Sequence, residues 1–88
     1  MALSLVSESS GLGLSQPYRD QFNRAVLSVA LNLAEGSAKP TKKAQKNHYS
    51  TSLGSLREVQ CILSLFNYPD LAKKADILGA HIYKLIQS

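Results

Sequence analysis

A stripe of polar residues inside an otherwise apolar segment constrains the fold of this chain most. Residues 24–36 read RAVLSVALNLAEG, which has the length and composition of a buried helix. Polar residues recur in it at spacings of four, four and three: Arg24, Ser28, Asn32 and Glu35. At 3.6 residues per turn these positions share one side of a helix, and buried polar groups need partners. The stripe therefore indicates a structural network in a helical bundle, with an interaction surface as the alternative.

The 88 residues predict a single all-α domain, an up-down antiparallel helical bundle. Turn and capping residues predict long helices over about 17–35, 42–66 and 70–87, with Ser15 and Thr41 as N-caps and Gly36 ending the first. Residues 1–14 are expected to hold a short or frayed helix and a loop. The short connections make consecutive long helices antiparallel.

Apolar residues at helical spacing predict which sides of the three helices form the core. The predicted core positions are Tyr18, Phe22, Ala25, Val29, Leu33, Tyr49, Leu53, Leu56, Leu63, Phe66, Leu71, Ala75, Leu78, Ile82 and Leu85. Leu27, Leu31 and Ala34 form a second apolar side on the first long helix, so a second neighbour is expected there. Gly54 lies in mid-helix, where we expect another helix backbone to approach closely.

Cysteine usage and the absence of long apolar runs point to the cytoplasm. Cys61 is the only cysteine, so no intrachain disulfide forms, and its apolar neighbours predict a buried thiol. No segment resembles a signal peptide, and the longest apolar run is too short to span a bilayer. A chain this small without disulfides or metals often gains stability by oligomerising, so we expect a homo-oligomer.

A cluster of lysines gives the chain its clearest functional signal. The net charge is +4, and Lys39, Lys42, Lys43 and Lys46 crowd into one segment, whereas no acidic residue occurs between Glu35 and Glu58. Cations at a helix N-terminus oppose the helix dipole, so stability alone does not explain them. The cluster indicates an anionic partner, nucleic acid before a membrane surface, with a merely solubilising surface as the alternative.

Two segments carry a resemblance to a known family. The run RAVLSVALNLAEGS (24–37), followed by LGSLREVQ (53–60), resembles the four-helix-bundle proteins encoded in 23S ribosomal RNA intervening sequences, which are similar to accessory variability proteins of diversity-generating retroelements. The resemblance implies a bacterial protein with an up-down bundle that assembles into a ring, typically a pentamer. This chain departs from the family at the N-terminus, where the family's first helix is usually much longer, so a shortened first helix is expected here. In the retroelement branch the ring binds nucleic acid and a reverse transcriptase. The positions that match the family's recurring residues, with a structural or interface role, are Arg24, Ser28, Asn32, Glu35, Gly54, Ser55 and Glu58.

Catalytic chemistry finds little support in the sequence. Glu35 and Glu58 lack the histidine three residues later that di-iron bundles use, so no metal or other cofactor is expected. Either glutamate is instead expected to pair with Arg24 or Arg57. A buried pair predicts a loss of ~3–5 kcal/mol for Glu35→Ala, and a surface pair predicts a loss below about 1 kcal/mol.

The sequence therefore predicts a non-enzymatic, oligomeric helical-bundle protein that binds RNA, or an RNA–protein complex, through its lysines. Such a surface is expected to bind RNA largely without regard to its sequence, and to bind it less tightly as the salt concentration rises. The alternative is a protein-interaction scaffold with no role in nucleic-acid binding, in which the lysines only solubilise. A metal-dependent enzyme ranks last.

Overall fold

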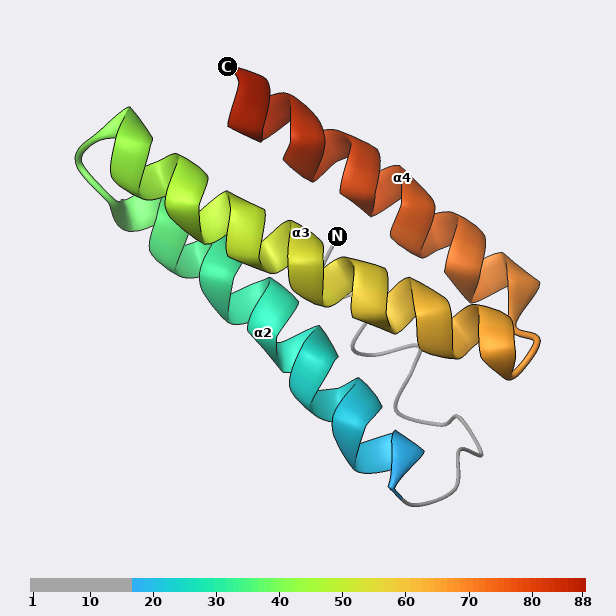
Figure 1. The fold of residues 1–88 in the computed structure, drawn as a ribbon. Coiled ribbons are helices and arrows are strands. Elements are labelled where there is room, and N and C mark those ends of the chain that lie inside the picture. The colour runs from blue at the N-terminus through green and yellow to red at the C-terminus, as the bar shows by residue number, and fades with distance from the viewer. Residues whose placement is uncertain (1–16) are drawn as a thin grey trace.

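Three helices make up the part of the chain that the computed structural model describes, residues 17–88. They are α2 (Tyr18–Ala38), α3 (Lys42–Leu65) and α4 (Pro69–Gln87), and they run up, down and up (Figure 1). The predicted all-helical bundle is confirmed for these residues. The short helix expected near the N-terminus and the Ser15 cap lie outside the described residues, so three helices are observed where a four-helix bundle was expected.

Side chains and backbone at the ends of α3 explain where it begins and ends. Thr41 caps its N-terminus, because the Thr41 Oγ1 accepts a hydrogen bond from the Ala44 N–H at 3.2 Å. At the other end Asn67 adopts a left-handed backbone (φ 63°), and the Tyr68 N–H donates to the Leu63 carbonyl at 2.9 Å. This is the Schellman arrangement. Pro69 then starts α4, where a missing N–H costs nothing.

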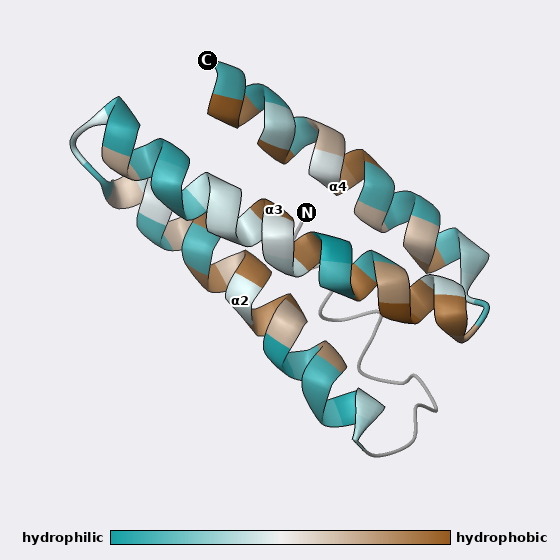
Figure 2. Cartoon of the chain, viewed as in Figure 1, coloured by the Kyte–Doolittle hydropathy of each residue, from teal (hydrophilic) through white to brown (hydrophobic). Residues whose placement is uncertain are grey.

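The central position of α3 organises the core. α2 and α4 pack against α3, and no Cα atom of α2 comes within 8 Å of one in α4. Hydrophobic residues occur along all three helices (Figure 2), and those of the core line this packing layer. The described core consists of Phe22, Ala25, Val26, Val29, Tyr49, Leu56, Val59, Ile62, Leu63, Ala75, Leu78 and Ile82. Most predicted core positions are therefore confirmed, with Leu33, Leu53, Phe66 and Leu71 partly buried beside them.

Two glycines differ from their predicted roles, and the close contact between helices lies at Gly36 instead of Gly54. Gly36 does not end α2: the helix continues to Ala38, and Gly36 is buried against α3. A Cβ on Gly36 would lie 2.7 Å from Tyr49 Cε1, so here the lack of a side chain permits close packing. Gly54 was expected to admit another helix backbone, but it is exposed, and nothing lies within 4 Å of a Cβ placed on it.

Several apolar residues lie outside the core, contrary to prediction. Tyr18 and Leu85 are 40% and 44% exposed, and Tyr18 meets the ring of Phe66 edge-on at 5.1 Å. Cys61 is exposed rather than buried, because it lies on the side of α3 that points away from both neighbouring helices.

The second apolar side of α2 remains at the surface. Leu27 and Leu31 are 55% and 51% exposed, and Ala34 beside them is also exposed. No helix among the described residues is long and apolar enough to cross a membrane.

Candidate functional site

The polar stripe of α2 meets polar residues of α3 in a connected network. We call this network the polar seam, made of Ser28, Asn32, Glu35, His48 and Ser55. The hydroxyls of Ser28 and Ser55 lie 2.8 Å apart and share a hydrogen bond. Asn32 Nδ2 donates to the Ser28 carbonyl at 2.9 Å and lies 3.2 Å from the Ser28 hydroxyl. The seam thus joins α2 to α3, as expected of a structural network.

His48 completes one end of the polar seam. Its Nδ1 lies 3.2 Å from Asn32 Oδ1 and 3.6 Å from Glu35 Oε2. Both neighbours accept hydrogen bonds, so the proton of a neutral imidazole belongs on Nδ1 in this arrangement. The contact with His48 was missed in the sequence, because only the antiparallel packing of α2 on α3 brings position 48 opposite position 32.

The expected pairing of Glu35 with an arginine is wrong. Glu35 contacts His48 instead, and its side chain is 60% exposed. The contact of Glu35 with His48 is therefore an exposed one, and its expected contribution to the free energy of unfolding is below about 1 kcal/mol.

Arg24 and Glu58 lie at the other end of the same face. With Gln21, Ala25, Ser28 and Ser55 they line a shallow groove between α2 and α3. Arg24 Nε donates to the Asp20 carbonyl at 3.4 Å, and no ion pair joins it to Glu58 within the described residues. The structure thus gathers the family-matched residues along α2 and α3, with Gly54 exposed on the outer side of α3.

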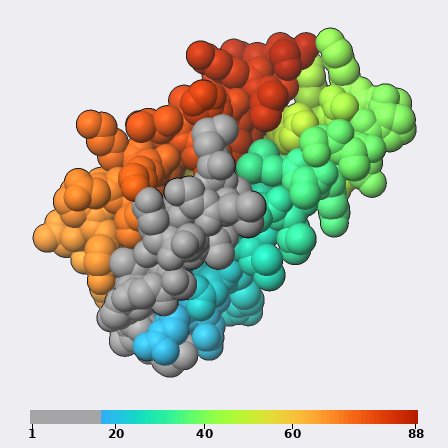
Figure 3. Space-filling model, turned by 180° about the vertical axis from the view of Figure 1, so that it is seen from behind, coloured from blue at the N-terminus to red at the C-terminus, as the bar shows by residue number. Residues whose placement is uncertain are grey.

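The lysines form a second site at one end of the molecule. We call Lys39, Lys42, Lys43 and Lys46 the basic patch. Lys39, Lys42 and Lys43 are exposed and Lys46 is half-buried. In Figure 3 the green and yellow atoms of this end lie next to the red end of α4. Consistent with that view, Lys42 Nζ donates to the Ser88 carbonyl at 3.3 Å.

Local contacts order the basic patch but do not neutralise it. Gln45 Nε2 donates to the Lys39 carbonyl at 3.0 Å and so holds the loop against α3. The first turn of α3 contains no acidic residue, and among residues 17–88 none of the four lysines forms an ion pair with an Asp or Glu side chain. The positive end of the α3 dipole adds to their charge. This end of the molecule therefore concentrates lysine charge, next to the C-terminal ends of α2 and α4, whose dipoles oppose it.

Side chains that could together bind a metal ion are absent from the described residues. Across residues 17–88, no three His, Cys, Asp or Glu side chains gather in a way that could hold a metal ion.

The described residues define the class of protein, a small antiparallel helical bundle. Within it, the sequence profile of the 23S rRNA-intervening sequence protein family matches residues 14–87, and the chain belongs to this family. The resemblance in the two motifs is thereby confirmed at the level of the family. No curated protein and no solved structure matches the chain.

Proposed function

We propose that this protein is a non-enzymatic, homo-oligomeric RNA-binding protein whose basic patch contacts phosphates. The observation that carries the proposal is the concentration of four lysines at the N-terminal end of α3 without a described acidic partner. The name of the family, which refers to an intervening sequence in 23S rRNA, gives weak independent support.

Phosphate neutralisation is the mechanism that fits such a surface. Exposed lysines on flexible stems contact phosphates as point charges and read no base edges. Binding is then driven mainly by counterion release and is largely indifferent to sequence. In a homo-oligomer the same patch recurs in every subunit, and the repetition strengthens binding of a long RNA through avidity.

Replacing the basic patch tests this function directly. The variant Lys39/Lys42/Lys43/Lys46→Ala should lose most binding to a fluorescein-labelled RNA in fluorescence anisotropy. Removing cations from a helix N-terminus relieves an unfavourable dipole interaction, so this variant should stay folded. The matched control replaces the same four residues with arginine, which keeps the charge, and should bind as the native protein does. Equal binding by the alanine variant would contradict the proposal.

Self-association has its own structural support in the second apolar side of α2. Leu27 and Leu31 are both more than half exposed on one side of this helix. We propose that a second copy of the chain covers them, in a ring that is pentameric by the family resemblance. Light scattering should show an oligomer for the native protein and a smaller species for Leu27/Leu31→Glu. The control Ile77→Glu alters a residue that is 50% exposed on α4 and should leave the oligomer intact.

The same apolar side favours a second candidate function, a protein-interaction scaffold. A reverse transcriptase is a possible partner by analogy with the retroelement proteins. A scaffold would keep its protein partner when the basic patch is replaced by alanine, whereas an RNA-bridged complex would lose it.

A further inference from the structure

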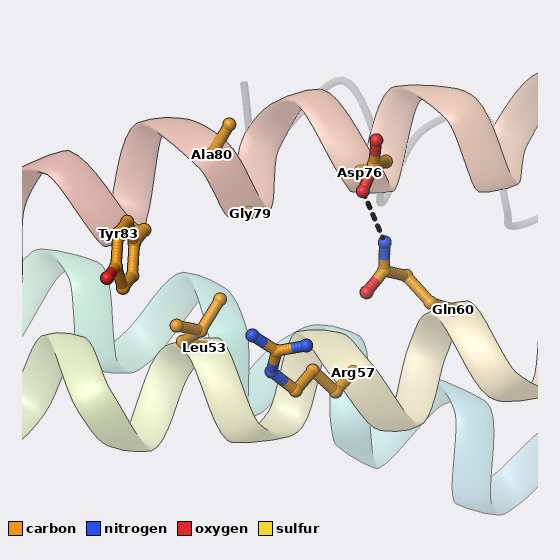
Figure 4. Close-up of a pocket in the computed structure, with 7 residues that line it drawn as sticks. All are labelled: Leu53, Arg57, Gln60, Asp76, Gly79, Ala80 and Tyr83. Carbon is orange, nitrogen blue, oxygen red and sulfur yellow. Dashed lines mark hydrogen bonds between the residues drawn. The ribbon is translucent and has the colours of Figure 1, made fainter.

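A groove on the α4 side of α3 lies outside both sites described above. It has a volume of about 310 Å³. It is lined by Leu53, Arg57, Gln60, Asp76, Gly79, Ala80 and Tyr83 (Figure 4). The lining residues of α3 and of α4 lie on opposite sides of the groove, and Gly79 adds no side chain to the α4 side.

Arg57 supplies an unneutralised charge in this groove. Figure 4 shows its guanidinium extending along the groove toward Leu53. The side chain is exposed, and no ion pair or hydrogen bond holds it within the described residues. A guanidinium in this setting can form two parallel hydrogen bonds to one phosphate.

The groove continues the basic patch along α3. Lys42 and Lys46 precede Arg57 by 15 and 11 residues, which places them within about 60° of it around the helix and about 22 and 16 Å away along the axis. The contact of Lys42 with the Ser88 carbonyl confirms that this side of α3 faces α4. Three cations thus lie in a row along one side of α3, and Arg57 is the one of the three that lines the groove.

Tyr83 provides an aromatic surface beside this row. Its ring lies on the α4 wall, is 51% exposed, and faces Leu53 and Arg57 across the groove. The hydroxyl accepts a hydrogen bond from Gln87 Nε2 at 3.0 Å, which helps to fix the ring. Exposed aromatic rings next to cations are typical of surfaces on which the bases of single strands stack.

An acidic residue at one end of the groove limits how far an RNA strand can extend along it. Gln60 Nε2 donates to Asp76 Oδ1 at 3.5 Å, so a carboxylate lies beyond Arg57 on the side away from the basic patch. A phosphate chain would meet repulsion there. The favourable path therefore runs from Lys42 to Arg57 and ends before Asp76.

We propose that the α3–α4 groove binds single-stranded RNA, with Tyr83 stacking on a base and Arg57 holding a phosphate of the strand that crosses the basic patch. This inference rests on the proposed function, because the strand enters from the same lysines. A single strand suits the groove because its bases are free to turn onto the tyrosine ring, whereas bases in a duplex are already stacked.

The test measures anisotropy of a fluorescein-labelled oligouridine of about twelve nucleotides, a length typical of single-strand sites. Tyr83→Ala should weaken binding about five-fold or more, and Tyr83→Phe, which keeps the ring, should bind as the native protein does. Arg57→Ala should weaken binding and lower the salt slope by about 0.7, the value for one single-strand phosphate contact.

Lys73→Ala serves as the charge control, because Lys73 is exposed on α4 but does not line the groove. It should have a smaller effect than Arg57→Ala. If the basic-patch alanine variant loses binding while Tyr83→Ala and Arg57→Ala bind as the native protein does, the groove inference is wrong and the proposed function stands. If the native protein fails to bind oligouridine at low salt, both are wrong.

Discussion

Substituting alanine at Gly36 and at Gly54 should change stability in opposite directions, although both residues lie within helices. Alanine is favoured over glycine in a helix by about 1 kcal/mol. At Gly54 nothing lies within 4 Å of the added Cβ, so the full gain is expected. Gly54→Ala should therefore raise the free energy of unfolding by about 1 kcal/mol.

At Gly36 the added methyl group would collide with the neighbouring helix. The Cβ would lie 2.7 and 3.0 Å from two ring carbons of Tyr49 and 3.1 Å from His48 Cβ. Tyr49 is only 9% exposed, so its ring has little room to move away. Overpacking of a core costs about 1–3 kcal/mol. After the helix gain is subtracted, Gly36→Ala should lower the free energy of unfolding by up to about 2 kcal/mol.

Urea unfolding followed by far-ultraviolet circular dichroism measures both changes. The variants are compared at one protein concentration, because self-association is linked to stability. The melting temperature of each variant should change in the same direction as its free energy of unfolding, by about 4–8 °C per kcal/mol for a domain of this size. A Gly36→Ala protein stabilised by the full helix gain, as Gly54→Ala is expected to be, would refute the close packing of α2 on Tyr49.

Three further predictions follow from the packing of single side chains. Glu35→Ala should lower the free energy of unfolding by less than about 1 kcal/mol, because its contact with His48 is at the surface; a urea titration showing ~3 kcal/mol or more would indicate a buried ion pair instead. Ser52→Ala should cost about 1 kcal/mol in the same assay, because the fully buried Ser52 hydroxyl donates to the Val29 carbonyl at 2.9 Å; an unchanged stability would argue against that bond. The exposed Cys61 thiol should react with an aromatic disulfide reagent about as fast in native protein as in urea, and strong protection in the native state would contradict its exposure.

Much of the fold could be predicted from periodicity. Apolar spacing identified the three long helices, and the cap at Thr41 was found from its residue type and confirmed by the hydrogen bond to Ala44. The core positions Phe22, Leu56 and Ile82 followed from the same spacing. These features depend on local sequence, so a single chain reveals them.

The errors concern how helices meet. Periodicity shows which side of a helix is apolar but not how closely a neighbour approaches it. The close contact between helices was therefore expected at Gly54, whereas the structure has it at Gly36. Cys61 looked buried because its sequence neighbours are apolar, yet α3 has neighbours on two sides only.

The site was predicted in part. Ser28, Asn32 and Ser55 were identified, but their partner His48 becomes visible only once α2 and α3 are packed. That Tyr83 and Arg57 line one groove was not predicted for the same reason, because their proximity depends on the packing of α4.

The salt dependence of RNA binding tests the central claim most directly. For single strands the logarithm of the binding constant falls with the logarithm of salt concentration by about 0.7 per phosphate contact. The account predicts a steep slope for the native protein and for the four-lysine-to-arginine variant, and a much shallower one with weak binding for the Lys39/Lys42/Lys43/Lys46→Ala variant. Equal slopes for the native and alanine proteins would show that the basic patch does not contact the phosphates and would contradict the account.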